Sequence, residues 1–125
     1  MRQAVILSVE DNAANRKIVR DLFEKSGYRV VEALDGEQGV EAAAREKPDV
    51  ILMDVQLPRM SGYDAARVVK SNPELRHIPI IAVTSYALSG DQQKAREAGC
   101  DGYVTKPFRP RLLLEMVEKY LKIPE

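Results

Sequence analysis

The sequence has little that would tie the protein to a membrane, a nucleic acid or an oxidising compartment. Cys100 is its one cysteine, which excludes an intrachain disulfide framework and favours a reducing compartment. The 19 basic and 19 acidic residues cancel to a formal net charge of zero, so there is no electrostatic reason to expect binding to nucleic acid or to an anionic membrane. No apolar run approaches the roughly 20 residues of a membrane span, and the run at residues 4–7 is too short for a signal peptide. We therefore expect a cytoplasmic protein.

Short apolar, β-branched runs recur along the chain. The runs at residues 4–9, 50–53 and 78–84 are typical of strands that are buried on both faces of a parallel sheet. Residues 28–33 also predict a strand, and Arg29 and Glu32 within it favour an edge position. Residues 102–105 are a fifth, shorter candidate. The chain is thus expected to contribute five strands to one sheet.

Amphipathic segments separate these runs. Ile18, Val19, Leu22 and Phe23 form an apolar stripe opposed by charged residues, and the helix that carries this stripe should stop at Gly27. Further helices are expected at about residues 35–47, 62–71, 89–98 and 110–122. The fourth of the five helices is polar except for its alanines. The fifth has an apolar arc of roughly 200°, wider than the ~100° that a core needs, so part of it either packs on a neighbouring helix or meets a partner.

Strands that alternate with helices predict an α/β fold in which helices cover both faces of a parallel sheet. Right-handed crossovers leave few topologies, and the doubly wound, flavodoxin-like strand order 2-1-3-4-5 is the natural one. The chain has no internal repeat, low-complexity segment or linker. Residues 1–125 are therefore expected to form a single domain.

Three acidic residues follow strands that should be neighbours in this sheet. Glu10 and Asp11 come after the first strand, and Asp54 comes after the third. Such sheets bind ligands at the carboxyl ends of their strands, where the strand order reverses. Carboxylates that converge there repel one another, which favours a bound cation, and hard oxygen ligands suit Mg²⁺. Taken alone, Glu10 and Asp11 are more simply explained as a solvated loop in which Asp11 or Asn12 caps the first helix.

Two further strand ends carry complementary groups. Thr84 ends the fourth strand, and Lys106 follows the fifth. A hydroxyl and an ammonium beside metal-bound carboxylates are groups that phosphoryl transfer needs, with Asp54 as the nucleophile that becomes an aspartyl phosphate. Each signal is weak by itself, because a threonine often lies in a strand and a lysine before a proline usually lies in a surface loop. Their joint position at four strand ends carries the prediction.

These residues belong to a wider set of motifs. The motifs are Glu10-Asp11-Asn12, residues 49–58 (DVILMDVQLP), Ser61-Gly62, Thr84 and residues 103–107 (YVTKP). With them the chain resembles, over essentially its whole length, the receiver domains of two-component signalling. Residues 90–107 are similar to those of DivK-type single-domain regulators of the cell cycle.

The resemblance implies a role for each residue at the strand ends. Asp54 is the phosphoacceptor, and Lys106 pairs with the phosphoryl oxygens. Asp11, Asp54 and the backbone carbonyl of Gln56 hold Mg²⁺ directly, whereas Glu10 acts on the metal through water. These roles make the protein a switch rather than an enzyme, one that catalyses its own phosphorylation and its own slow dephosphorylation.

The resemblance also implies how the switch is read out. The Thr84 hydroxyl bonds to the phosphoryl group, the Tyr103 ring reports the change, and the Lys106–Pro107 peptide bond is cis. The signal leaves through the face made by the fourth helix, the fifth strand and the fifth helix. The implied partners are a histidine kinase or histidine phosphotransferase as donor and a protein target downstream. No direct nucleic-acid or membrane partner is expected, and the protein should be a monomer or a weak dimer.

Other functions fit these residues less well. A phosphatase of the haloacid-dehalogenase type needs a second Asp as general acid two residues after the nucleophile, where this chain has Gln56. A flavin or nucleotide module needs a Gly-, Ser- or Thr-rich loop after the first strand, where this chain has Glu10-Asp11-Asn12. A degenerate receiver that only binds partners is disfavoured because every expected functional side chain is present.

Overall fold

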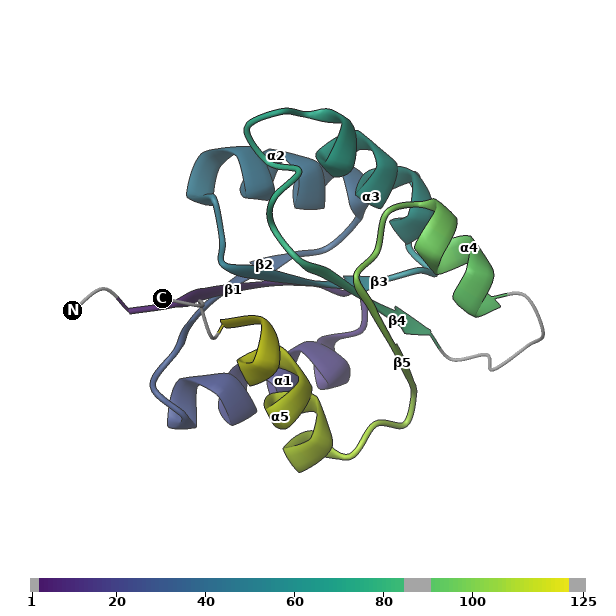
Figure 1. Cartoon of the computed structure of the whole chain (residues 1–125). Helices are drawn as coiled ribbons and strands as arrows, with labels where there is room; N and C mark the ends of the chain where they lie inside the picture. The colour runs from purple at the N-terminus through teal and green to yellow at the C-terminus, as the bar shows by residue number, and fades with distance from the viewer. Residues whose placement is uncertain (1–2, 85–90, 122–125) are drawn as a thin grey trace.

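Parallel strands and helices alternate along the chain in the computed structural model, which describes residues 3–84 and 91–121 (Figure 1). The strands are β1 (Val5–Val9), β2 (Arg29–Ala33), β3 (Val50–Asp54), β4 (Ile80–Thr84) and β5 (Gly102–Thr105). The helices are α1 (Ala13–Lys25), α2 (Gly36–Glu46), α3 (Gly62–Ser71), α4 (Asp91–Glu97) and α5 (Pro110–Leu121). The strands are all parallel and pair in the order β2-β1-β3-β4-β5, which confirms the predicted topology.

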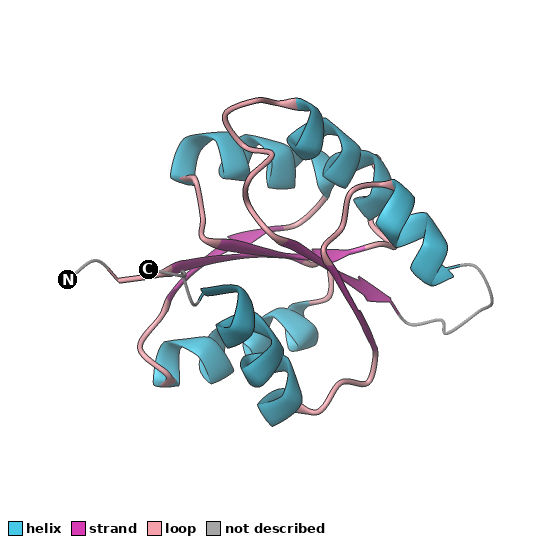
Figure 2. Cartoon of the chain, in the orientation of Figure 1, coloured by secondary structure: helices cyan, strands magenta, loops and turns pink. Residues whose placement is uncertain are grey.

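The sheet lies between two layers of helices (Figure 2). α2, α3 and α4 cover one face, and α1 and α5 cover the other. Side chains alternate between the two faces along each strand, so in β1 Leu7 and Val9 pack toward α2 and α3, whereas Ile6 packs toward α1 and α5. β1, β3 and β4 are buried along their whole length. Burial on both faces is why their sequences are nearly continuous apolar runs.

The helix boundaries follow the capping signals in the sequence. Asn12, Asp35 and Ser61 are the N-caps of α1, α2 and α3, and each side chain accepts a hydrogen bond from a backbone N–H three residues later. Gly27 has a φ of 92°, the left-handed conformation that ends a helix readily at glycine, so α1 stops where predicted. Residues 89, 90 and 122 of the predicted helices lie outside the described residues.

Three strands begin later than predicted: β1 at Val5 rather than Ala4, and β2 and β4 for a reason that the local backbone shows. β4 begins at Ile80 rather than at Ile78, because the Ile78 N–H donates to a carbonyl of the preceding turn (3.0 Å) and Pro79 has no N–H to give to the sheet. β2 begins after Tyr28, whose N–H donates to the Phe23 carbonyl (3.0 Å) at the end of α1. In both places a local turn takes the N–H that the strand would need.

The wide apolar arc of α5 packs almost entirely against the core. Leu113 and Val117 are buried in the cluster beneath the sheet, and four further members of the arc are half-buried against it. These four are Leu114, Met116, Tyr120 and Leu121. Leu112 stays 55% exposed. Within the described ranges, no helix has the length and apolar character needed to cross a membrane.

Candidate phosphorylation and metal site

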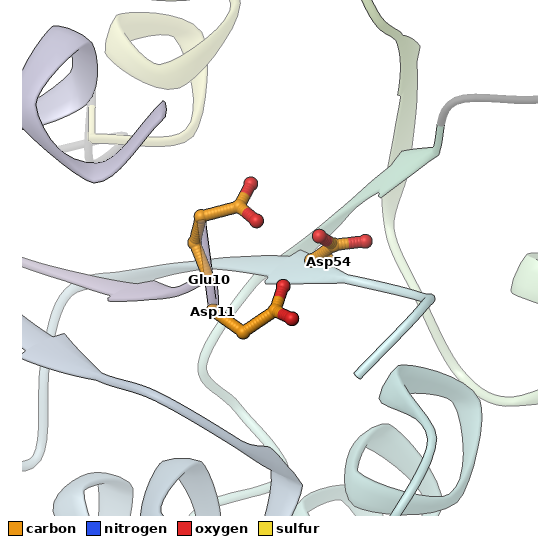
Figure 3. Close-up of side chains that lie close together, drawn as sticks. All are labelled: Glu10, Asp11 and Asp54. Carbon is orange, nitrogen blue, oxygen red and sulfur yellow. The ribbon is translucent and has the colours of Figure 1, made fainter. Parts of the chain in front are cut away.

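Three carboxylates converge at the carboxyl ends of β1 and β3 (Figure 3). Glu10 and Asp11 follow β1, and Asp54 is the last residue of β3. Each of the three side chains has an oxygen within 4.8 Å of an oxygen of the other two. Glu10 and Asp54 are 6% and 4% exposed, whereas Asp11 lies at the surface. The three acidic residues that were predicted to converge therefore do so.

The alternation of side chains along the strands decides which groups face one another. Glu10, Asp54 and Lys106 each lie an even number of residues after a strand side chain that packs toward α1 and α5. Those three side chains are Ile6, Leu52 and Val104. Glu10, Asp54 and Lys106 therefore project from the same face of the sheet at its carboxyl edge.

Lys106 bridges two of the carboxylates. Its Nζ donates to Glu10 Oε1 at 2.6 Å and to Asp54 Oδ2 at 3.0 Å. The Lys106 side chain is 14% exposed. The Lys106–Pro107 peptide bond is cis, as predicted. The ammonium is thus the countercharge of two buried carboxylates, in the pocket where the resemblance implies a partner for phosphoryl oxygens.

The burial of this cluster shifts the proton affinities of its members. Burial, together with a side-chain contact to Asp54, raises the pKa of Glu10 to about 7, and the Lys106 ammonium opposes this rise. Burial alone would lower the pKa of the Lys106 ammonium, but its hydrogen bonds to Glu10 and Asp54 outweigh burial and raise that pKa. The ammonium therefore stays protonated at neutral pH.

Backbone groups hold the two buried carboxylates in place. The Gln56 N–H donates to Asp54 Oδ1 (2.9 Å), and the Asn12 N–H donates to Glu10 Oε2 (3.2 Å). Gln56, which is predicted to offer its carbonyl to a metal, thus lies in the loop directly after β3. The backbone at the start of α3 lies directly against the end of β3, because a Cβ on Gly62 would come within 2.1 Å of the Asp54 carbonyl oxygen. Only glycine allows this close approach.

Thr84 and Tyr103 lie on neighbouring strands. Thr84 ends β4 and is 1% exposed, and Tyr103 of β5 is in register with Ala82. Because Ala82 and Thr84 are two residues apart, their side chains share a face of the sheet. The half-buried Tyr103 packs on this face with Ala82, Val55 and Ala95 of α4. Both residues predicted to form the switch therefore lie on the face that α4 covers.

The acidic cluster has the donor chemistry of a divalent cation site. Its three carboxylates offer hard oxygen ligands within 4.8 Å of one another. Mg²⁺ prefers such ligands in small number and keeps several of its waters, and Asp11 leaves the cluster open to solvent on one side. The residues present fit Mg²⁺.

The sequence from residue 6 to residue 118 matches the family described as "Response regulator receiver domain". The chain belongs to this family. This receiver domain is 42% identical to the polar-differentiation response regulator DivK of Brucella anthropi, over 93% of the chain and 94% of that relative. It is thus a DivK-like receiver domain of two-component signalling.

Solved structures of receiver domains share the fold. The receiver domain of a sensor histidine kinase from Pseudomonas aeruginosa, with a magnesium ion coordinated in its active site cleft, is 38% identical and has a TM-score of 0.89, over 96% of this chain and 98% of that one. The chemotaxis protein CheY4 of Vibrio cholerae is 28% identical and has a TM-score of 0.90, over 95% of this chain and 99% of that one. The sheet order and the two helical layers are therefore those of known receivers.

Arg16 is a residue of this receiver's site that was not predicted. It lies in the first turns of α1, and its Nη1 donates to the carbonyls of Glu10 (3.1 Å) and Asp11 (3.0 Å). One signal in the sequence could have found it. A basic residue near the start of a helix opposes the helix dipole, and here it follows an acidic pair by five and six residues.

Proposed function

We propose that the protein is a phosphorylation switch whose phosphoacceptor is Asp54. The observation that carries the proposal is the Lys106 ammonium, which is held between Glu10 and Asp54 at 2.6 Å and 3.0 Å in a buried pocket. An ammonium in this position can pass from the carboxylates to the oxygens of an incoming phosphoryl group without leaving the pocket. Preorganised positive charge of this kind is the main protein contribution to phosphoryl transfer.

The reaction is the transfer of a phosphoryl group from a histidine side chain to a carboxylate. An oxygen of Asp54 attacks the phosphorus, so that a P–O bond forms while the P–N bond breaks, and the electron pair of the broken bond stays on the imidazole nitrogen. Asp54 then carries an acyl phosphate. Slow hydrolysis by water returns the carboxylate and inorganic phosphate, which resets the switch.

Mg²⁺ would be held by Asp11, Asp54 and the backbone carbonyl of Gln56, with Glu10 acting through bound water. When bound, the metal neutralises negative charge on the phosphoryl oxygens. Lys106 supplies a second positive charge to the same oxygens. The three converging carboxylates and the magnesium ion in the receiver of the P. aeruginosa kinase support this assignment.

The donor is a histidine kinase or a histidine phosphotransferase, and the recipient of the signal is another protein. The similarity to DivK, a response regulator, and to the receiver of a sensor histidine kinase supports a donor of this class. Thr84 and Tyr103 would carry the signal to the face formed by α4, β5 and α5. The chain would act in the cytoplasm as one receiver domain, as a monomer or weak dimer, with no direct nucleic-acid or membrane partner.

Intact-mass spectrometry tests the assignment of Asp54. With Mg²⁺ and a small phosphodonor such as acetyl phosphate, the protein should gain the mass of one phosphoryl group, and EDTA should prevent the gain. Asp54→Asn should gain nothing. Asp64→Asn, which alters an exposed carboxylate in the first turn of α3, should be labelled like wild type. Labelling of Asp54→Asn to the wild-type level would refute the assignment.

A further inference from the structure

Arg16 ties the acidic loop to the start of α1. One atom of its guanidinium, Nη1, donates to the backbone carbonyls of both Glu10 (3.1 Å) and Asp11 (3.0 Å). The backbone of Arg16 is itself fixed, because its N–H donates to the Asn12 carbonyl (3.0 Å) as in a regular helix. The side chain is half-buried. The contact therefore joins a rigid helix to the two residues after β1.

This contact fixes the direction in which Asp11 projects. In an extended chain, consecutive carbonyls point to opposite sides. Here the carbonyls of Glu10 and Asp11 both reach one nitrogen atom, so the chain must turn at Asp11, and the turn sets the direction of its Cα–Cβ bond. Figure 3 shows the Asp11 carboxylate extending toward Asp54.

Asp11 depends on this backbone more than Glu10 does. The Glu10 carboxylate is held by hydrogen bonds from Lys106 (2.6 Å) and from the Asn12 N–H (3.2 Å). The Asp11 carboxylate makes no hydrogen bond within residues 3–84 and 91–121, and it lies at the surface. The loop backbone is therefore what decides where this carboxylate lies.

Once a cation is bound, charge disfavours a basic residue at this place, because the cation offsets the attraction of the three carboxylates. The positive end of the helix dipole lies at the start of α1, and the first turn has no acidic residue to balance it. A cation bound between Glu10, Asp11 and Asp54 would also be repelled by the guanidinium. The hydrogen bonds to the Glu10 and Asp11 carbonyls compensate for this unfavourable charge and explain a basic residue at position 16.

We propose that Arg16 is a positioning residue for the divalent cation, and that it holds the Glu10–Asp11 backbone so that the Asp11 carboxylate is ready to bind. This role rests on the proposed magnesium site. Electrostatic repulsion alone predicts that removal of the Arg16 guanidinium strengthens Mg²⁺ binding. The positioning role predicts the opposite, a loss of Mg²⁺ affinity.

Mg²⁺ titrations followed by backbone amide NMR shifts measure the effect, and the same spectra show whether each variant is folded. Arg16→Gln should bind Mg²⁺ roughly tenfold more weakly than wild type, within the range for loss of a group that supports metal ligands. Arg16→Lys keeps the charge without the forked guanidinium and should bind about threefold more weakly. Lys17→Gln is the matched control, because it removes a neighbouring charge whose partner is Asp21. Its affinity should equal or exceed that of wild type.

The outcomes separate the role of Arg16 from the magnesium site itself. Weakening of about threefold or more in Arg16→Gln, with incomplete recovery in Arg16→Lys, supports the proposal. Any smaller weakening, tighter binding, or full recovery in Arg16→Lys overturns it. Failure of wild type to bind Mg²⁺ refutes the metal site instead. The metal-free proteins then test only whether Arg16 holds the loop: equal amide exchange of Asn12 in Arg16→Gln and wild type overturns that contact's effect, and faster exchange in the variant supports it.

Discussion

Replacing Lys106 with methionine should destabilise the protein, because it strips the countercharge from two buried carboxylates. The ammonium lies 2.6 Å from Glu10 and 3.0 Å from Asp54, on a side chain that is 14% exposed. Each hydrogen bond to a charged group contributes about 1.5–3 kcal/mol, and breaking a buried ion pair typically costs about 3–5 kcal/mol. Methionine does not carry the desolvation cost of a buried ammonium, which offsets part of this loss. We therefore expect the free energy of unfolding to fall by about 3 kcal/mol and the melting temperature by roughly 10 °C.

Urea unfolding followed by circular dichroism at pH 8 measures this loss, since Glu10 of the wild type, with a pKa of about 7, is mostly ionised there. In Lys106→Met the ammonium that lowers this pKa is gone, so Glu10 holds its proton more tightly and part of the loss is the cost of that protonation. Lys17→Met is the control. Its ammonium lies 2.6 Å from Asp21, but the two side chains are 67% and 45% exposed, a setting in which an ion pair contributes ~0–1 kcal/mol. Added Mg²⁺ should narrow the gap between Lys106→Met and wild type, because the cation replaces the missing charge. A loss in Lys106→Met no larger than that in Lys17→Met would refute the reasoning.

Two further predictions concern a close backbone contact and a phenol. Gly62→Ala should lower the free energy of unfolding by about 2–3 kcal/mol, because its Cβ would lie 2.1 Å from the Asp54 carbonyl oxygen. Gly39→Ala, whose Cβ would meet side-chain methyl groups of Val9 at 3.0 Å and 3.1 Å rather than backbone, should cost less in the same denaturation assay, and equal losses would contradict this account. The hydrogen bond to Glu118 raises the pKa of Tyr28 from 10.0 to about 12, so the stability that this contact adds is complete below pH 10 and is lost as the pH rises through about 12. Ultraviolet titration of Glu118→Gln should show Tyr28 ionising nearer pH 10, and an unchanged titration would rule out Glu118 as the cause.

The strands of the sheet could be predicted because the burial of each strand determines the residue types within its own segment of sequence. A central strand buried on both faces must be apolar at nearly every position, and β1, β3 and β4 are. Once their order was inferred, the convergence of Glu10 and Asp54 followed from the position of each at a strand end. The starts of β2 and β4 were harder, because the backbone N–H groups of Tyr28 and Ile78 have two possible acceptors and a local turn takes them.

The contacts within the site were less accessible from the sequence. The bridge from Lys106 spans 96 residues to Glu10 and 52 residues to Asp54, and no local pattern says which carboxylate an ammonium will meet. Arg16 acts on backbone carbonyls, which every residue has, so a basic residue after an acidic pair marks the position in the sequence but not the atoms that it contacts. Side-chain chemistry at strand ends is thus predictable from pattern, whereas side-chain contacts to the backbone depend on how the chain turns.

The helix α4 is the element best suited to respond to phosphorylation. Its one buried residue in the described structure is Ala95, and Gln92, Gln93, Lys94, Arg96 and Glu97 are exposed. A helix of seven residues with so little buried apolar surface lies at the low end of local stability. Tyr103 packs against Ala95 from β5, on the face of the sheet that Thr84 shares. A change at Thr84 therefore has a short physical route to α4.

Phosphorylation should draw the Thr84 hydroxyl toward the phosphoryl oxygens, let the Tyr103 ring move behind it and alter the packing of α4. A hydrogen bond to a charged group contributes about 1.5–3 kcal/mol, enough to change the population of a marginal helix roughly tenfold or more. Amide hydrogen exchange with and without beryllofluoride, a phosphoryl mimic, measures the response. Exchange should change by about this factor across residues 91–98 and around Tyr103 in wild type and in Thr84→Ser, which keeps the hydroxyl. It should not change there in Thr84→Ala. Changes confined to the surroundings of Asp54 in all three proteins would mean that the phosphoryl group alters only local charge, and that Thr84 does not carry the signal.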